Sequence, residues 1–386
     1  MEEQNNTGLR RAAEIYRHRG LRARQLKEEG KKIFGYFCCY PPIELLTALD
    51  ITPIRVLGNM DEPVTEADDY LPPVMCIFCR SAFDLGMKAQ YNYFDGFVGA
   101  HACDGAERTS FIWQNYIHSP CNFQLDVPHT AHGPALTFFK EQIALFQKTL
   151  ETFCGTQIHP DDLRQAIALH NRQRALVREL YGLRKPNPPL VSGTEMLQVL
   201  IAVMSIPVTE GNDLLQAVIN EVTTRANPHA PKHRLLIWGS LIDHAAFTEL
   251  IESSGFNIVV EDTAIGTRPF WHDIEMTADP LDGISDHYLN EVLCPRTFRE
   301  TGPSYQADSD ARFNYLKEFA KHWNVDGVFA NIIRNCDIHG YEVPVIKDYL
   351  NAIGLPVLVI EQDYSTAALE PLRTRFEAFA ESIDGY

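Results

Sequence analysis

The sequence predicts an α/β protein made of two Rossmann-like or flavodoxin-like domains with parallel sheets, joined by a helical connecting segment. Short apolar runs alternate with amphipathic stretches in residues 1–150, and the same alternation returns in residues 231–386. Residues 151–230 instead have mainly helical spacing. Strands that alternate with helices over short connections form parallel sheets covered by helices on both faces. A chain of 386 residues is also too long for one ordinary core, so at least two domains are expected.

The first domain is expected to begin with a helical arm and to continue with strand–helix units. Residues 9–30 have helical spacing with basic residues on the outer face, and this arm would pack on the first domain or on a partner subunit. The strand KKIFGYFCCYP ends at Pro41 and Pro42, because proline cannot continue a regular ladder. The further expected elements are a helix at 43–51, a strand at 52–58, a helix after Cys76, a strand at 93–98, a helix at 105–117 and a strand at 121–128.

Long helices are predicted from residue 132 onward, through the connecting segment. A helix over 132–155 ends at Gly155, and a second over 159–182 carries Asp161 and Asp162 in its first turn, where negative charge is favourable. The stretch YGLRKPNPPLVSG is rich in proline and glycine and is interpreted as a linker. A further helical pair, at 193–206 and 209–227, leads to the second domain.

The second domain repeats the organisation of the first. The segments RLLIWGS, FNIVVED, DGVFAN and LPVLVIE are predicted strands, and DHAAFTELIESSG and YEVPVIKDYLNAIG are predicted helices. A long loop is expected from Ala264 to Asp282, and IIRNCDIHG is interpreted as a loop after its strand. The remaining expected elements are helices near 283–292 and 308–322 and a closing helix.

Composition excludes several classes of partner. The formal net charge is −17, from 51 acidic and 34 basic residues, which argues against nucleic acid or an anionic membrane surface. No apolar run approaches the roughly 20 residues that span a bilayer, and the N-terminus MEEQNNTGLRR has no hydrophobic segment of the signal-peptide kind. A cytoplasmic protein is therefore expected. Nine cysteines in such a chain favour metal ligation over a disulfide framework.

Three cysteine-containing segments fall where ligands bind in such sheets. Cys76 and Cys79 have the two-residue spacing of zinc and iron–sulfur sites, Cys103 follows the strand YFDGFV, and Cys336 follows DGVFAN. The carboxyl ends of the strands form the ligand-binding edge of an open α/β sheet, and a helix that starts there favours a thiolate. Cysteines from matching strand ends of two domains could meet and hold an iron–sulfur cluster, although separate buried thiols would give the same pattern.

Common nucleotide and hydrolase motifs are absent. The sequence has no GxxxxGK[ST] loop, no GxGxxG and no GxSxG elbow, so the chain is not expected to bind ATP or a dinucleotide in the usual manner. His101, His129 and His132 lie near the cysteine stretch, but a histidine is more often a hydrogen-bonded structural group than a catalyst.

Several segments spread over nearly the whole chain carry a resemblance to a known family. They are CCYPPIELLTALDITPIRVLG, CIFCRSAFDLG, FDGFVGAHACDGAER, NRQRALVRELYGLRKPNP with IPVTEGNDLL, LLIWGS, EDTAIGTRPF and NCDIHGYEVPVIKDYL. With these segments the chain resembles the family that unites 2-hydroxyacyl-CoA dehydratases with ATP-dependent benzoyl-CoA reductases. It looks most like the smaller cluster-bearing subunit of the reductases, the C-type subunit, and the segment NRQRALVRELYGLR favours that side.

The resemblance implies a cofactor, a set of ligands and several partners. A [4Fe-4S] cluster would be held by Cys76, Cys103 and Cys336, with the fourth iron not bound by a protein cysteine. The implied partners are a larger homologous cluster-bearing subunit, an ATP-hydrolysing iron–sulfur activator, ferredoxin as the electron source, and an aromatic acyl-CoA. The absence of a phosphate-binding loop agrees with this division of labour, because ATP would be handled by the activator.

The resemblance also leaves alternatives open. In the reductases two electrons and protons enter an aromatic ring held as its CoA thioester, whereas the dehydratases eliminate water through a ketyl radical. A non-catalytic assembly partner without a competent cluster is a third possibility. A double-cubane cluster is a minor alternative, because Cys38 resembles a cysteine of that branch but its full set of ligands cannot be matched.

Other residues beside the matched motifs have open roles. Cys39 and Cys79 have no reliable counterpart in the family pattern, so each is a packing residue or an additional ligand. A further group could orient the substrate or relay protons, although a structural salt bridge or helix cap is at least as good an interpretation of each. This group consists of Glu44, Arg80, His101 and Asp104.

Overall fold

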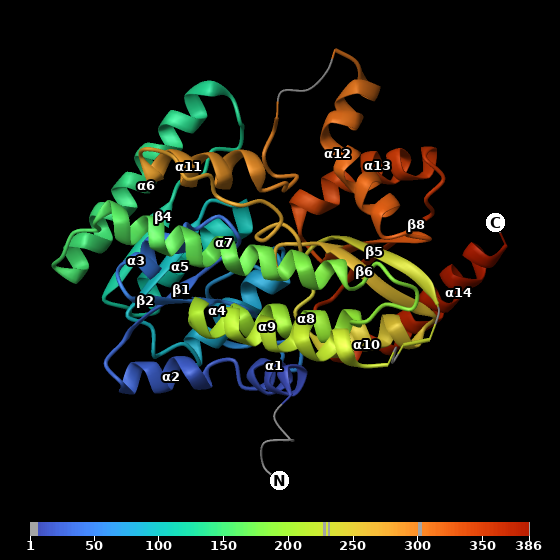
Figure 1. Ribbon diagram of the computed structural model, residues 1–386, viewed down its shortest axis with the longest axis horizontal. Coiled ribbons are helices and arrows are strands. Elements are labelled where there is room, and N and C mark those ends of the chain that lie inside the picture. The colour runs from blue at the N-terminus through green and yellow to red at the C-terminus, as the bar shows by residue number, and fades with distance from the viewer. Residues whose placement is uncertain (1–6, 227–228, 231, 300–302, 386) are drawn as a thin grey trace, which may run out of the picture.

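The computed structural model describes residues 7–226, 229–230, 232–299 and 303–385 (Figure 1). Within them lie two four-stranded parallel sheets, with strand orders β2-β1-β3-β4 and β6-β5-β7-β8. Both sheets are surrounded by helices, which confirms the predicted pair of Rossmann-like or flavodoxin-like domains. The strands are β1 Lys32–Tyr36, β2 Ile51–Arg55, β3 Gly96–Ala100, β4 Cys121–Leu125, β5 His233–Gly239, β6 Phe256–Asp262, β7 Gly327–Ile333 and β8 Val357–Gln362.

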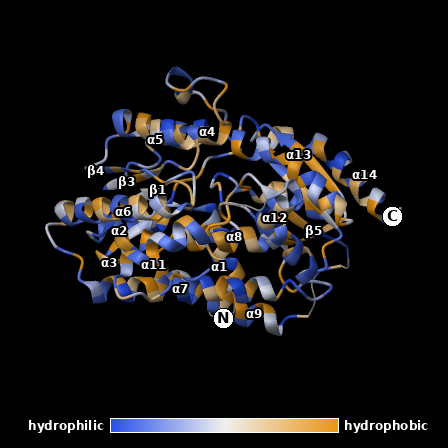
Figure 2. Ribbon diagram, turned by 90° about the horizontal axis from the view of Figure 1, so that it is seen from above, coloured by the Kyte–Doolittle hydropathy of each residue, from blue (hydrophilic) through white to orange (hydrophobic). Residues whose placement is uncertain are grey.

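The central strands β3 and β7 are buried along their whole length, as expected for strands covered on both faces. The hydropathy colouring in Figure 2 shows the apolar residues gathered toward the interior, on strands such as β5 and on the inner faces of the helices. Of the helices in the described ranges, none combines the length and the apolar character needed to span a bilayer. The first six residues, part of the segment considered for a signal peptide, lie outside the described residues.

The first domain contains α1 to α5, of which α1 and α2 are the two halves of the predicted N-terminal arm. Its helices are α1 Gly8–Arg17, α2 Leu21–Glu28, α3 Ile43–Ala48, α4 Ile77–Met87 and α5 Asp104–Tyr116, with a short 3-10 turn at Glu66–Asp69. The arm breaks near Gly20, because the chain turns there between two different packing surfaces. Helix α2 packs on β1, as expected, but α1 packs on α8 and α9 of the connecting segment. A Cβ at Gly8 would lie 2.6 Å from the backbone nitrogen of Val218, so α1 and α9 approach closely.

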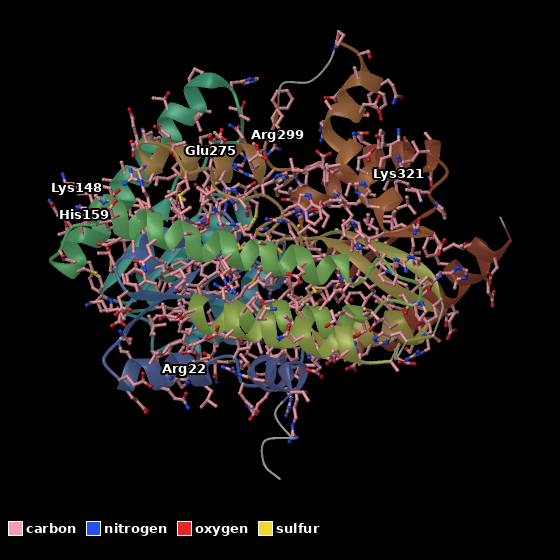
Figure 3. All side chains as sticks on the ribbon, in the orientation of Figure 1. Arg22, Lys148, His159, Glu275, Arg299 and Lys321 are labelled. Carbon is pink, nitrogen blue, oxygen red and sulfur yellow. The ribbon has the colours of Figure 1, made fainter. Side chains whose placement is uncertain are left out.

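The connecting segment spans both domains. Helix α6 Gly133–Cys154 leads into it, and its own helices are α7 Pro160–Gly182, α8 Gly193–Val203 and α9 Val208–Thr224. Helix α6 ends at Gly155 in a left-handed conformation, as predicted. Helix α7 packs on α3 of the first domain and α8 packs on α10 and β6 of the second, so the segment holds the two domains together (Figure 1). Arg22 of α2, labelled in Figure 3, adds an ion pair to Glu210 of α9 with an N–O distance of 2.8 Å.

The predicted linker is a connection, but it is tightly packed rather than a free spacer. Arg184 within it is fully buried and donates to Glu261 of β6 over 2.7 Å. The carbonyl of Arg184 in turn accepts from the guanidinium of Arg234 at 2.8 Å. Ser192 and Glu195 form a capping box at the start of α8. These buried polar contacts fix the connecting segment to the second sheet.

The second domain contains α10 to α14, two of which differ from the sequence prediction. Its helices are α10 Ala245–Ser253, α11 Pro280–Asp286, α12 Tyr305–His322, α13 Asp337–Ala352 and α14 Arg373–Asp384, with a π-helical turn at His287–Glu291 and 3-10 turns at Thr366–Ala368 and Glu370–Leu372. Helix α11 begins within the predicted long loop. The predicted loop IIRNCDIHG is wrong at both ends, because β7 continues to Ile333 and α13 begins at Asp337. Only three residues therefore separate the strand from the helix.

Residues 280–299 follow β6 in the sequence but pack on the first domain. Helix α11 lies against α6 and α7. The hydroxyl of Tyr288 donates to the carboxylate of Glu44 in α3 at 2.9 Å, and Thr130 pairs with Phe298 in an isolated parallel bridge. This return crossing brings the chain beside the carboxyl ends of the first sheet.

Candidate functional site

The three cysteines proposed as ligands all precede helices. Cys103 follows β3 and is the N-cap of α5, where its sulfur accepts the backbone N–H of Ala106 at 3.4 Å. Cys336 follows β7 and is the N-cap of α13, and Cys76 is the N-cap of α4. A helix N-terminus favours negative charge through its unpaired N–H groups and its dipole. The helix start favours a thiolate at each position, but burial and the neighbouring thiols outweigh this effect and raise the pKa of Cys103 and of Cys336.

Hydrogen bonds connect the cysteine-bearing loops of the two domains. The side-chain amide of Asn335 donates to the carbonyl of Pro73 at 3.2 Å, and the N–H of Ile77 meets the carbonyl of Arg334 at 3.5 Å. The thiols of Cys76 and Cys336 lie close enough for each to shift the pKa of the other. Two cysteines separated by 260 positions in the sequence thus meet across the domain boundary.

Cys103 completes the group. Burial raises the pKa of the Cys103 thiol, and the neighbouring Cys336 and Cys76 raise it further. The neighbouring Cys76 thiol and then burial raise the pKa of Cys336 to about 12. Without a bound cation these thiols stay protonated at neutral pH, so a metal would displace their protons on binding. Three mutually repelling thiolates need such a positive partner, and this donor set fits an iron–sulfur cluster.

The arrangement differs from that of a single-ion site. Among the residues that the structure describes, no three His, Cys, Asp or Glu side chains are grouped closely enough to hold one metal ion. The cysteines of an iron–sulfur cluster bind different iron atoms, so their sulfurs lie farther apart than the ligands of one zinc ion. In the described part of the chain, Cys76, Cys103 and Cys336 therefore do not form a site for one metal ion.

A groove with both apolar and charged lining residues opens beside Cys76. It is lined by residues of the Pro72–Cys76 segment, by the first two turns of α5, and by Asn335 and Asp337. Val74 is 78% exposed and Phe111 is 49% exposed, so this wall presents large apolar side chains to solvent. Cys76 lines the groove, so this surface leads to the cysteine-bearing segment.

The other cysteines near the site form a second group around it. Cys79 lies three residues after Cys76 on the same face of α4, and its thiol interacts with that of Cys76. The sulfurs of Cys38 and Cys39 are 4.0 Å apart directly after β1. A hydrogen bond from Cys39, aided by the charge of Arg55, lowers the pKa of Cys38 to about 6. These contacts place Cys38 and Cys79 close to the three proposed ligands.

Two of the candidate substrate-orienting residues are engaged in ion pairs. Glu44 is fully buried and accepts from Arg174 of α7 at 2.6 Å. Arg80 is buried on α4 and pairs with Asp68 of the preceding 3-10 turn. Glu44 and Arg80 therefore form salt bridges, which is the structural role that the sequence allowed as the alternative to a substrate role.

The other two candidates lie nearer to the surface. His101 is hydrogen-bonded through Nδ1 to Asp126 at 3.1 Å, and its Nε2 lies 3.0 Å from Nε2 of His129. Asp104 begins α5 and forms an ion pair with Arg108 one turn later, with both side chains more than half exposed. Asp104 thus acts as a helix-start carboxylate, while the two histidines form a hydrogen-bonded pair next to Cys103.

Arg296 is an important residue that sequence analysis missed. It is 5% exposed and donates to four main-chain carbonyls of the first domain, at distances of 2.6 to 3.1 Å. These carbonyls belong to the loops after β3 and β4, at residues 101, 102, 127 and 128. Arg296 therefore fixes the loop that carries Cys103. Its sequence context, CPRTF, has no feature that would reveal this role.

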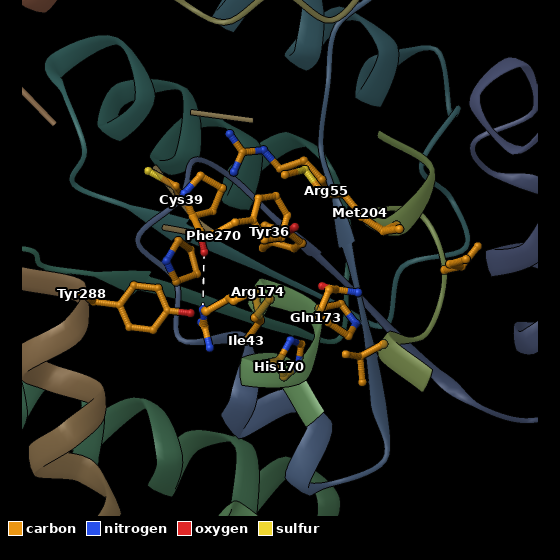
Figure 4. Close-up of a pocket in the computed structure, with 16 residues that line it drawn as sticks. Tyr36, Cys39, Ile43, Arg55, His170, Gln173, Arg174, Met204, Phe270 and Tyr288 are labelled. Atoms are coloured by element: carbon orange, nitrogen blue, oxygen red, sulfur yellow. Dashed lines mark hydrogen bonds between the residues drawn. The ribbon is translucent and has the colours of Figure 1, made fainter. Parts of the chain in front are cut away.

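A separate small pocket lies behind Cys39. It is lined by Tyr36, Cys39, Arg55 and Phe270, with Arg174 and Tyr288 at the other side (Figure 4). The guanidinium Nε of Arg174 donates to the carbonyl of Pro269 at 3.4 Å. The pocket lies between the buried Glu44–Arg174 ion pair and the turn that contains Cys38 and Cys39.

The buried network beneath this pocket makes stability dependent on pH. Burial lowers the pKa of His170 to about 4, and although burial opposes it, the charges of Arg174 and His170 lower the pKa of Glu44 to about 2. Both groups bind protons more readily in the unfolded chain, so stability should fall with pH below about 6.5, first through His170 and then through Glu44. We expect the His170 contribution to reach at most about 3 kcal/mol near pH 4.

Thermal unfolding followed by circular dichroism between pH 7 and pH 4 would measure this loss. In His170→Gln the imidazole is removed, so the unfolding temperature should fall less steeply across that range. The Thr47 hydroxyl, 2.9 Å from Nε2 of His170, remains available as a partner for the glutamine. An identical slope in the variant would contradict the role assigned to His170.

Comparison with known proteins decides the family. The family model for the 2-hydroxyglutaryl-CoA dehydratase D-component matches residues 38–383. The chain belongs to this family. The resemblance inferred from the sequence is therefore confirmed, and the match includes all three proposed ligands.

Relatives are similar over almost their full length but at low identity. YjiM of Escherichia coli strain K12, which is named for a proposed dehydratase role, is 28% identical over 94% of both chains. The C subunit of benzoyl-CoA reductase from Thauera aromatica is 25% identical over 94% of both. The (R)-phenyllactyl-CoA dehydratase beta subunit of Clostridium sporogenes is 22% identical over 93% of this chain and 94% of its own. The chain is thus related to subunits of both dehydratases and a reductase.

Proposed function

We propose that this chain is a cluster-bearing subunit of a benzoyl-CoA reductase-type enzyme, in which Cys76, Cys103 and Cys336 hold a [4Fe-4S] cluster. The proximity of these three thiols, each at the start of a helix and contributed by both domains, carries the proposal. Similarity to the C subunit of benzoyl-CoA reductase supports it. When bound, such a cluster supplies one-electron transfer at a potential set by its surroundings.

The residues of this chain would perform three tasks around that group. The three cysteines leave one iron without a protein thiolate, which is the counterpart of the open position in a catalytic zinc site. Arg296 and Asn335 hold the loops that carry the cysteines in place. The groove beside Val74 and Phe111 offers an apolar surface for the ATP-hydrolysing activator, which would receive electrons from ferredoxin and deliver them close to Cys76.

Acyl-CoA chemistry would require a second, larger homologous subunit. The family relatives include proteins named as C or beta subunits, and these names support assembly of this chain with another subunit. The substrate of the proposed enzyme is an aromatic acyl-CoA whose ring receives two electrons and two protons to give a dienoyl-CoA.

A 2-hydroxyacyl-CoA dehydratase subunit is the second candidate. The names of YjiM and of the phenyllactyl-CoA dehydratase beta subunit favour it. Elimination of water is redox-neutral, so an electron is needed only to start turnover and is recovered at its end.

Product analysis separates these two functions. We expect the complex of this chain, its larger partner and the activator to convert benzoyl-CoA to a dienoyl-CoA, with continuous consumption of the reductant and of ATP. Chromatography of the CoA esters and the amount of reductant oxidised per product would be measured together. An enoyl-CoA formed from a 2-hydroxyacyl-CoA with only catalytic amounts of reductant would instead establish the dehydratase.

A further inference from the structure

We infer that His339 donates a hydrogen bond from its Nδ1–H group to the sulfur of Cys336, and that Arg268 holds the imidazole in the tautomer that makes this possible. His339 would thereby be a positioning residue for the proposed ligand Cys336. The inference rests on the proposed function where it concerns the cluster, but the tautomer itself is a property of the chain alone.

The geometry places His339 between the sulfur and a permanent cation. Its Nδ1 lies 3.2 Å from Sγ of Cys336, one helical turn earlier on α13. Its Nε2 lies 3.0 Å from Nη1 of Arg268. His339 is 8% exposed and Arg268 is 3% exposed, so water competes little for either contact. The imidazole is thus bound at both nitrogens within the protein.

The chemistry of arginine decides which nitrogen carries the proton. A guanidinium has only donors and is not deprotonated in proteins, so Nε2 of His339 must accept. A neutral imidazole that accepts at Nε2 has its hydrogen on Nδ1. That hydrogen points to the sulfur of Cys336, which lies within hydrogen-bond distance of Nδ1. The contact is therefore an N–H···S hydrogen bond with the histidine as donor.

Arg268 is itself fixed by an anchored carboxylate. Its Nε and Nη2 donate to the two carboxylate oxygens of Asp262, at 3.1 and 3.2 Å, and Nη2 also donates to the Asp262 carbonyl at 3.0 Å. The hydroxyl of Tyr315 donates to the same carboxylate at 2.8 Å. The ring of Trp238 meets His339 edge-on, with a centroid distance of 5.5 Å. The imidazole has little freedom to turn away from Cys336.

This hydrogen bond should raise the reduction potential of a bound cluster. Hydrogen bonds to ligand sulfurs are one of the means by which a protein sets cluster potential. A donor stabilises negative charge on sulfur, and the reduced cluster has the greater negative charge. Loss of the His339 donor should therefore lower the reduction potential and leave the three cysteines in place.

The first test uses the cluster-free chain, and the tautomer itself is read from the wild-type protein. Nitrogen-15 labelling of the histidines, fourteen in the chain, allows each tautomer to be read from the nitrogen shifts and their couplings to ring protons. The His339 signals are identified by their disappearance in His339→Asn. We expect a protonated Nδ1 and an unprotonated Nε2. A protonated Nε2 in the wild-type chain would overturn the inference whether or not the protein binds iron.

The second test measures the potential of the iron-loaded chain by anaerobic titration with electron paramagnetic resonance. His339→Leu has no donor, while His339→Asn keeps an amide N–H near the position of Nδ1 and serves as the matched variant. We expect a lower potential in His339→Leu and a smaller shift in His339→Asn, with iron content unchanged in both. Equal potentials in wild type and His339→Leu at equal iron content would overturn the inference, whereas absence of iron from the wild type would instead refute the proposed function.

Discussion

Replacement of Cys336 by alanine is expected to reduce bound iron and sulfide from about four of each per chain to near background. Cys336 is the only one of the three proposed ligands that comes from the second domain, so its loss leaves Cys76 and Cys103 without a thiol across the domain boundary. Two thiolates do not hold a cluster that normally has cysteine on three irons. Iron and sulfide assays on protein purified without oxygen, with electron paramagnetic resonance of the reduced state, would measure the loss.

Cys154→Ala is the matched control for this experiment. Cys154 is half-buried like Cys336 but lies at the end of α6 beside Lys32, away from the three ligands. It should retain full iron and sulfide. Cys76→Ala and Cys103→Ala should behave like Cys336→Ala. Unchanged iron content in all three variants, or no iron in the wild-type chain, would contradict the cluster proposal and favour a non-catalytic assembly partner.

Much of the fold could be predicted because its signals are local. Alternating apolar strands and amphipathic helices determine a parallel sheet, and the carboxyl ends of parallel strands share one edge. The sequence pattern alone therefore assigns Cys103 and Cys336 to equivalent positions in the two domains. It predicts the start of α13 four residues too late, because Gly340 costs a helix about 1 kcal/mol and only packing offsets that cost.

The contacts that join the two domains could not be predicted in the same way. Arg296 and Tyr288 follow β6 in the sequence, yet both contact the first domain. Their positions depend on where residues 280–299 pack, and no periodicity or turn motif specifies that path. His339 could have been found, since a histidine three residues after a helix-capping cysteine lies on the same face of the helix. Its partner Arg268 is 71 positions away and had no such signal.

The second large effect is expected at Glu44, whose replacement by glutamine should destabilise the protein by about 3–5 kcal/mol. The glutamine keeps the size of the side chain but removes its charge. Arg174, 4% exposed at its side chain, would then be a buried cation without its carboxylate partner. Urea unfolding at pH 7 would measure the change in the free energy of unfolding.

Two further variants distinguish this structural role from a catalytic one. Tyr288→Phe removes only one hydrogen bond to Glu44 and should cost about 1 kcal/mol. Glu44→Leu combined with Arg174→Met removes both charges and should recover much of the stability lost in Glu44→Gln, because the main penalty is an unpaired buried charge. If Glu44 instead handles substrate, Glu44→Gln would lose turnover while its unfolding free energy stays near that of wild type. The ion pair of 2.6 Å between α3 and α7 favours the first result, since these helices join the first domain to the connecting segment.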